Sequence, residues 1–150
     1  NQVEFSLVHR SPEADGVLET CRELGVTLIA YSPLGRGLLS GKYRPGSEPK
    51  DMRKRISHFK GENFGRIRPL LDALEQIAAK YKVTMAQAAI NWLARIPEVF
   101  PIPGAKNEAQ SIANAEAASF DMTDEDAGKL DELSAEFKVA KPFRRDGSRS

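Results

Sequence analysis

The chain has 150 residues, of which 41% are apolar and 29% are charged, and its formal net charge is +1. This length suits one domain, and the near-neutral charge gives no reason to expect nucleic acid or an anionic membrane as a partner. No apolar run approaches the roughly 20 residues that a membrane-spanning helix needs.

The first elements predicted along the chain are a strand, a helix and a second strand. Residues 3–7 have the composition of a short strand. A helix is expected to begin with Ser11 as its N-cap and to end at Gly25, with Leu24 as the last residue of its apolar face. Residues 26–31 are almost all apolar, which predicts a strand covered on both faces.

The only cysteine of the chain, Cys21, lies on the apolar face of this predicted helix. We expect a buried, unreactive thiol, because a free cysteine usually behaves as a small apolar residue. A single cysteine cannot form an internal disulfide. The sequence therefore favours a reducing compartment, and we expect the cytoplasm.

A long irregular segment separates the second strand from the next helices. Residues 32–65 are rich in glycine, proline and charge and show no sustained periodicity, which predicts a functional or disordered loop. Apolar residues then recur with helical spacing over 67–78. A further helix is expected to follow Thr84 as its N-cap, and residues 99–102 have the composition of a third strand.

Two capping signals predict the last helices. Asn107 is followed three residues later by Gln110, which resembles a capping box. Thr123 stands in the same relation to Asp126, and Leu130 is expected on the inner face of the helix that follows.

The order of these elements predicts the fold class. Strands that alternate with helices indicate an α/β protein with a parallel sheet and right-handed crossovers. Three parallel strands alone would leave open edges, so we expect part of a larger α/β domain. Residues 1–137 form this unit, and 138–150 are expected to be a flexible basic tail. The chain opens at Asn1 on a strand-like run without a signal-like segment, as a fragment would.

Two strand-to-helix loops have the chemistry of phosphate sites. Residues 31–42 contain three glycines together with Arg36 and Lys42, so backbone N–H groups and positive charge could cradle a pyrophosphate. The spacing matches neither the P-loop nor the dinucleotide-binding glycine motif, and a plain glycine-rich connector is the alternative. Residues 101–107 place Lys106 beside a helix N-terminus, which suits a phosphate monoester, with a solvated turn as the alternative.

The ordered set of motifs resembles the aldo-keto reductase family, from residue 1 to about 137. The resemblance implies the C-terminal half of a (β/α)8 TIM-type barrel, in which the loops after the seventh and eighth strands bind phosphate. It also implies NADP(H) as cofactor and hydride transfer to a small aldehyde or ketone. The motifs that carry the resemblance are NQVEFS at 1–6, the runs at 31–42 and 101–107, GENF at 61–64 and AQAA at 86–89.

The resemblance also assigns roles to single residues. Gln2 matches the residue that hydrogen-bonds the nicotinamide carboxamide, and Tyr31 matches the aromatic residue that stacks on the nicotinamide ring. Lys106 matches the position beside the adenosine 2′-phosphate, which implies NADPH rather than NADH. The full set of matched cofactor positions is Gln2, Tyr31, Ser32, Pro33, Leu34, Gly35, Gly37, Lys42, Arg53, Gly104, Lys106, Gln110 and Asn114.

One of these assignments has alternatives, and the sequence departs from the family at one neighbouring position. Arg53 is one of three neighbouring candidates, with Lys54 and Arg55, for the arginine that folds over the adenosine end, and a solvated basic loop is the alternative. Ala113 stands where the family often has a glutamate that contacts the adenine amine. The loss of that hydrogen bond is expected to cost about 0.5–1.5 kcal/mol of binding.

The family's catalytic Asp, Tyr, Lys and His have no match in this chain. His9 and His58 do not stand in the family's catalytic context, and general acid catalysis needs a positioned donor. The resemblance therefore implies no catalytic residue, no metal, and no carbonyl reduction by the chain alone. Three hypotheses remain: an oxidoreductase fragment that needs its missing N-terminal half, a self-associating half-barrel that binds nucleotide without catalysis, and a relic that binds nothing.

Overall fold

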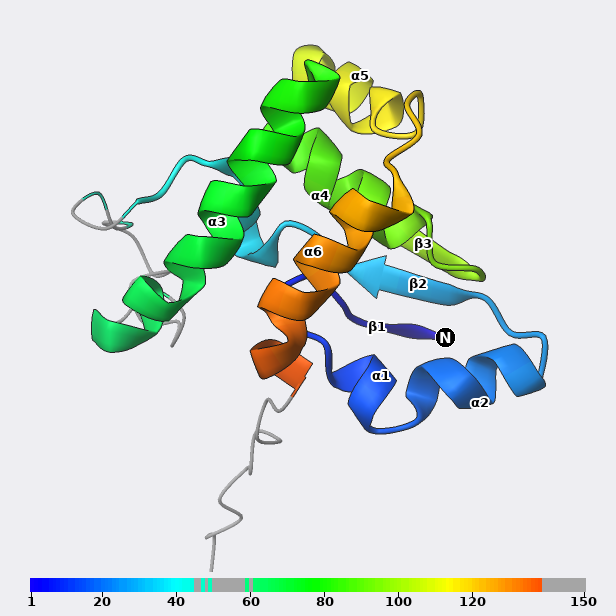
Figure 1. Cartoon of the computed structure of the whole chain (residues 1–150). Helices are drawn as coiled ribbons and strands as arrows, with labels where there is room; N and C mark the ends of the chain where they lie inside the picture. The colour runs from blue at the N-terminus through cyan, green and yellow to red at the C-terminus, as the bar shows by residue number, and fades with distance from the viewer. Residues whose placement is uncertain (45–46, 48, 50–58, 60, 139–150) are drawn as a thin grey trace, which may run out of the picture.

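A three-stranded parallel sheet with helices packed over one of its faces forms the centre of the computed structural model (Figure 1). The structure describes residues 1–44, 47, 49, 59 and 61–138. Its elements are β1 (Gln2–Glu4), α1 (Ser11–Ala14), α2 (Val17–Glu23), β2 (Leu28–Tyr31), the 3₁₀ helix η1 (Gly35–Ser40), α3 (Gly61–Tyr81), α4 (Met85–Ala94), β3 (Val99–Ile102), α5 (Glu108–Glu116), α6 (Asp124–Ser134) and the 3₁₀ helix η4 (Ala135–Lys138).

The strand order is β1-β2-β3, and both pairs are parallel, as the sequence predicts. The register aligns Glu4 with Tyr31 and Tyr31 with Ile102, so the three strands end at one level. We call this level, with the segments that follow each strand, the carboxyl edge. The strand β3 has the predicted bounds, whereas β1 and β2 are shorter than expected.

Local backbone hydrogen bonds explain why both strands are shorter than expected: one set follows β1 and the other precedes β2. Ser6 and His9 exchange both of their backbone hydrogen bonds, at 3.0 Å each, which turns the chain away from the sheet after β1. The backbone N–H of Val26 donates to Cys21 at 2.8 Å, which ties the start of the predicted strand to α2 instead of the sheet.

One face of the sheet is buried and the other is open. Leu28 and Ala30 point to the helices and are fully buried. Successive strand residues alternate between faces, so Tyr31, Phe100 and Ile102 share the opposite face, where they are 37%, 62% and 47% exposed. The described residues supply a layer on one side only, so the cover that the sequence predicts for the second face does not come from them. We call this surface the open face.

The predicted helix over 11–25 is two short helices. Gly16 has φ +80° and forms the N-cap of α2, so the chain bends between α1 and α2. Ser11 is the first residue of α1 instead of its cap, and Arg10 stands at the N-cap, where its side chain makes no capping hydrogen bond. Gly25 has φ +62° and follows the helix end, as predicted. Leu24 is 71% exposed, because the rotated α2 no longer turns it to the core.

The later helices begin close to their predicted caps. Thr84 and Gln87 form the complete capping box of α4. The hydroxyl of Thr123 caps α6 by accepting from the Asp126 N–H. The helix α3 starts at Gly61, six residues before the predicted periodic segment, and the rest of the long loop up to residue 60 lies largely outside the described residues.

The core lies between the sheet and the helices. Phe5, directly after β1, is fully buried and packs edge-on against Trp92 of α4, with ring centroids 6.0 Å apart. Leu38 of η1 and Leu130 of α6 are also fully buried in this cluster, and Cys21 is 5% exposed, as expected of an unreactive thiol. Burial of each large apolar side chain contributes roughly 1.5–3 kcal/mol, so the helical layer is held mainly by this cluster.

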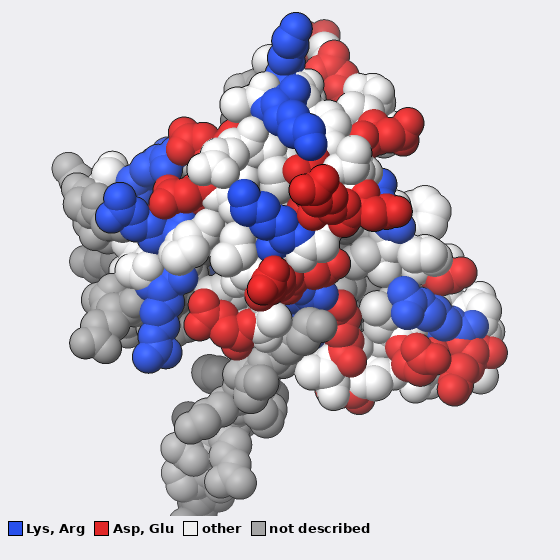
Figure 2. Space-filling view, in the orientation of Figure 1, with Lys and Arg blue, Asp and Glu red and all other residues white. Residues whose placement is uncertain are grey.

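The surface over α3 and α6 mixes charges of both signs (Figure 2). Arg44 contacts Glu75 at 2.7 Å, and Lys80 contacts Asp126 at the same distance. This view shows no broad patch of one sign, in line with the net charge of +1. Within the described residues, no helix combines the length and apolar character that crossing a membrane requires. The tail predicted at 138–150 lies, apart from residue 138, outside the described residues.

Candidate functional site

The carboxyl edge gathers the two loops that the sequence marks as phosphate sites. The strand β2 leads directly into η1 (Figure 1), and β3 leads into the segment 103–107 and then α5. The strands are hydrogen-bonded neighbours, so the two loops leave the sheet side by side. Ligand sites in parallel α/β sheets form at this edge.

The loop after β2 has an unusual backbone. We call residues 32–42 the glycine loop. Positive φ values occur at Ser32 (53°), Gly35 (53°), Arg36 (59°) and Gly37 (95°), so the chain changes direction sharply between two 3₁₀ turns. Non-glycine residues seldom adopt this region, and one that does is held there by its surroundings. The segment is therefore more ordered than the irregular loop that the sequence predicts.

Most of the glycine loop's backbone hydrogen bonds stay inside the loop. The N–H of Gly35 donates to Ser32 O at 2.9 Å, and the N–H of Gly37 donates to Leu34 O at 3.0 Å. These two amides are therefore engaged, although the sequence suggested glycine N–H groups as phosphate donors. In this conformation the loop offers a phosphate chiefly the charges of Arg36 and Lys42, which are both exposed.

The glycine loop packs closely against the residues beneath it, in the segment after β1 and in α4. A Cβ on Gly35 would lie 2.6 Å from Val8 Cγ2, and a Cβ on Gly41 would lie 2.6 Å from Met85 Sδ. Pro33 is buried, and Leu34 packs partly buried against the core. These contacts fix the loop against the segment after β1 and against α4, so its exposed side chains project from a rigid support.

The loop after β3 forms a polar cluster around the start of α5. The side chain of Asn107 caps α5 by accepting from the Gln110 N–H at 2.9 Å. The side chain of Gln110 returns to the N–H of Lys106, at 2.8 Å, one residue earlier than the capping box we expected. Asn114 Nδ2 donates to Gly104 O at 3.4 Å. Four predicted site residues thus lie together, and Lys106 holds an exposed charge beside a helix N-terminus.

The remaining predicted site residues either lie on β1 and β2 or fall outside the described residues. Gln2 is exposed and lies on the open face. It is two residues before Glu4 on the same strand, and Glu4 is in register with Tyr31, so the three side chains share this face. The Tyr31 ring stands at the end of β2, where it is 37% exposed. Arg53 and its alternatives Lys54 and Arg55, as well as His58, lie outside the described residues.

One contact at the carboxyl edge was missed from the sequence. Glu4 Oε2 lies 3.9 Å from a guanidinium nitrogen of Arg36. The side chain of Glu4 is 22% exposed and that of Arg36 is 54% exposed. Because Glu4 lies two residues after Gln2 on the same strand, the sequence could have placed both side chains on the open face. No signal within the neighbouring sequence indicates that Glu4 contacts Arg36.

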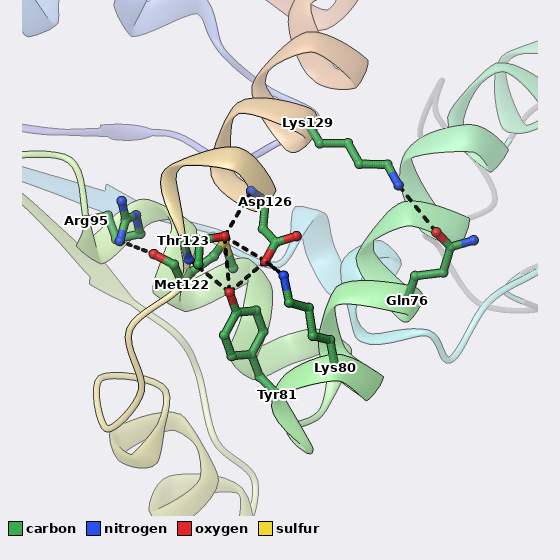
Figure 3. Close-up of polar contacts among 8 residues, drawn as sticks. All are labelled: Gln76, Lys80, Tyr81, Arg95, Met122, Thr123, Asp126 and Lys129. Atoms are coloured by element: carbon green, nitrogen blue, oxygen red, sulfur yellow. Dashed lines mark hydrogen bonds and ion pairs between the residues drawn. The ribbon is translucent and has the colours of Figure 1, made fainter.

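A second polar cluster lies away from this edge, between α3 and α6 (Figure 3). Asp126 Oδ2 accepts from Lys80 Nζ at 2.7 Å and from the Tyr81 hydroxyl at 2.6 Å. Chiefly through the hydrogen bond from Lys80, then that from Tyr81, the pKa of Asp126 falls to about 2. The same hydrogen bond raises the pKa of Lys80. Neither helix carries a described residue of the candidate site, so the cluster is a clamp between two helices.

The described histidine, His9, lies outside the candidate site, in the turn after β1. His9 Nε2 lies 2.9 Å from the hydroxyl of Ser11, within the turn after β1. Among the described residues, no three His, Cys, Asp or Glu side chains are grouped so as to hold a metal ion.

Parallel strands with crossover helices, an open inner face and phosphate-type loops after consecutive strands define part of an α/β barrel. The chain matches the model of the aldo/keto reductase family over residues 1–135, and it belongs to that family. It is 41% identical over 126 residues to aldo-keto reductase str7 of Strobilurus tenacellus, covering 82% of this chain and 38% of that protein. It is 38% identical over 130 residues to the chloroplastic pyridoxal reductase of Arabidopsis thaliana, covering 87% and 34%.

The solved structures agree on a partial barrel. The glycerol dehydrogenase AKR11B4 of Gluconobacter oxydans aligns with a TM-score of 0.81 at 27% identity, over 91% of this chain and 42% of that one. The thermostable aldo-keto reductase Tm1743 aligns with a TM-score of 0.66 at 32% identity, over 88% and 38%. The chain thus spans about two-fifths of the length of these relatives, and the prediction of a part of a TIM-type barrel is confirmed.

Proposed function

We propose that this chain is the NADP(H)-binding part of an oxidoreductase that transfers hydride between NADPH and an aldehyde or ketone. The observation that carries the proposal is that parallel neighbouring strands bring Tyr31, the glycine loop and Lys106 to one edge. One relative, yakc of Schizosaccharomyces pombe, has NADP(+) in its name and is 36% identical over 123 residues.

The exposed groups at this edge suit a dinucleotide with an extra phosphate. The ring of Tyr31 is accessible for stacking on the nicotinamide, and the amide of Gln2 on the same face can hydrogen-bond the carboxamide. Lys42, at the end of the glycine loop, adds positive charge for the pyrophosphate. Lys106 and the N-terminus of α5 offer charge and N–H donors to the 2′-phosphate.

NADPH supplies the hydride when it is bound, and the chain's own residues bind and orient it. We propose that the chain alone does not reduce carbonyls, because the Asp, Tyr, Lys and His of the family have no counterpart in its sequence. The proton donor would come from a completing polypeptide that covers the open face, where Phe100 and Ile102 are 62% and 47% exposed. The unpaired Cys21 suits a reducing compartment, and we propose the cytoplasm.

Calorimetric titration with NADPH tests this proposal in the wild type and in two variants of Tyr31. Saturable binding is expected for the wild type and for Tyr31→Phe, which keeps the ring. Tyr31→Ser removes the ring and is expected to weaken binding by about two- to tenfold, the usual worth of an aromatic contact. Equal affinities for all three proteins would remove Tyr31 from the site, and no binding by the folded wild type would overturn the proposal.

A second candidate is a nucleotide-binding half-barrel that covers its open face with a second copy. The exposed apolar side chains of β2 and β3 favour it, because a soluble domain seldom leaves such residues clustered on a sheet. Sedimentation of the wild type and of Phe100→Ser separates the two. A dimer that dissociates on this substitution supports self-association. A monomer that binds NADPH favours completion by another polypeptide.

A further inference from the structure

The pair formed by Glu4 and Arg36 joins two parts of the proposed cofactor site. Glu4 is the last residue of β1 and lies in register with Tyr31. Arg36 lies in the middle of the glycine loop, and its guanidinium approaches Glu4 Oε2 to 3.9 Å. An acidic side chain therefore lies beside the exposed ring and within reach of the loop proposed to meet the pyrophosphate.

The backbone of Arg36 is fixed more firmly than its side chain. Its φ of 59° falls between the positive φ values of Gly35 and Gly37, and Gly35 packs against Val8 without room for a Cβ. The side chain is 54% exposed, and its contact with Glu4 is longer than a direct hydrogen bond. The contact with Glu4 can therefore be given up without moving the loop backbone.

Arg36 is one of two exposed cations, with Lys42, that the glycine loop offers to a phosphate. The N–H groups of Gly35 and Gly37 already donate to carbonyls within the loop, at 2.9 and 3.0 Å. A guanidinium is well suited to phosphate oxygens, because it presents several donors in a fixed plane. Glu4, in contrast, is a fixed negative charge on the same edge, and it competes with a phosphate for the same guanidinium.

We propose that Arg36 exchanges Glu4 for the cofactor pyrophosphate on binding, and that Glu4 thereby weakens cofactor affinity and speeds cofactor release. This inference rests on the proposed function, because it concerns the same ligand. Glu4 acts through Arg36 as a positioning residue. The carboxylate keeps the guanidinium at the edge in the free chain and returns it there when the cofactor leaves.

A double-mutant cycle on the full chain tests the exchange, with the dissociation constant and the release rate of NADPH as readouts. Glu4→Gln is expected to tighten NADPH binding by about two- to fivefold, the range for partly exposed ion pairs, mainly through slower release. Arg36→Gln is expected to weaken binding. In the Arg36→Gln background, Glu4→Gln is expected to have a much smaller effect, because the competition is gone.

Two fragments locate the effect on the ligand. ADP carries the pyrophosphate and 2′-AMP carries only the 2′-phosphate, so Glu4→Gln should strengthen ADP binding and leave 2′-AMP binding unchanged. Glu19→Gln is the matched control, since Glu19 forms a similar exposed pair with Arg22 at 3.8 Å on α2. It removes the same charge and should change neither ligand.

The outcomes separate this inference from the proposed function. Wild-type binding of NADPH with no change in Glu4→Gln overturns the exchange and leaves the proposed function standing. Weaker binding in Glu4→Gln also overturns it, because Glu4 would then support the ligand instead of competing. Failure of the folded wild type to bind NADPH overturns both.

Discussion

The hydroxyl of Tyr81, at the end of α3, donates a 2.6 Å hydrogen bond to the carboxylate of Asp126, in the first turn of α6. The Thr123 N–H donates to the same hydroxyl at 2.9 Å, so Tyr81 joins the cap of α6 to the body of α3. The helices α3 and α6 are held together at this point (Figure 3).

Asp126→Asn is expected to lower the free energy of unfolding at pH 7 by about 1.5–3 kcal/mol, the range for hydrogen bonds to a charged group. The folded carboxyl has a pKa of about 2 against an ordinary value of 3.8. A lowered pKa stabilises the fold above the ordinary value, and this contribution is lost as the pH falls toward 2. Urea denaturation should therefore show the difference between wild type and variant shrinking below about pH 4. Asp121→Asn changes an exposed carboxylate and is the control, which should behave like the wild type at every pH. If Asp126→Asn still differed from the wild type by the full amount at pH 2, this account would be contradicted.

Arg10→Met is expected to destabilise the fold by about 3 kcal/mol, because it leaves the partners of a buried charge unpaired. The Arg10 side chain is 3% exposed, lies 5.0 Å above the Trp92 ring, and bonds Glu13, Ser134 and Asp131. Urea unfolding monitored by Trp92 fluorescence measures the loss.

Arg22→Met is the control for that substitution. The Arg22 side chain is 38% exposed and its ion pairs are 3.7 and 3.8 Å long, so its loss should cost less than about 1 kcal/mol. Equal losses for the two variants would show that burial of Arg10 adds nothing.

Gly35→Ala is expected to cost more stability than Gly25→Ala. Both glycines have positive φ, +53° and +62°, which costs an alanine roughly 1–2 kcal/mol. Only at Gly35 does the new Cβ also meet a buried side chain, Val8, at 2.6 Å, which should add roughly 1–3 kcal/mol. Thermal unfolding of both variants measures the difference, and similar midpoints would mean that the glycine loop yields easily.

Local signals in the sequence predicted the elements well. The run 99–102 became β3 with the same bounds, and Thr84 caps α4 as expected. Both depend on residues within a few positions of each other. The bend at Gly16 was missed, because the serine and proline at 11 and 12 signalled a helix start and the spacing beyond Gly16 continued the helical period.

Contacts between distant residues could not be predicted in the same way. Tyr81 and Asp126 are 45 residues apart, and Glu4 meets Arg36 only because β1 and β2 pair in register. The apolar composition of the strands indicated that both faces need cover, but composition alone does not show which face the helices of this chain cover. The family resemblance, in contrast, needed only motifs in order, and the match over 1–135 confirms it.

The most direct test of the central claim compares NADPH with NADH in the wild type, Lys106→Ala and the control Lys129→Ala, whose exposed lysine lies on α6. Equilibrium titration should show the wild type and the control preferring NADPH by roughly tenfold, as expected of one charge-assisted contact with the 2′-phosphate. Lys106→Ala should lose that preference while its affinity for NADH stays the same. A preference that survives in Lys106→Ala, or the absence of saturable binding by the folded wild type, would contradict the claim that this edge holds NADP(H).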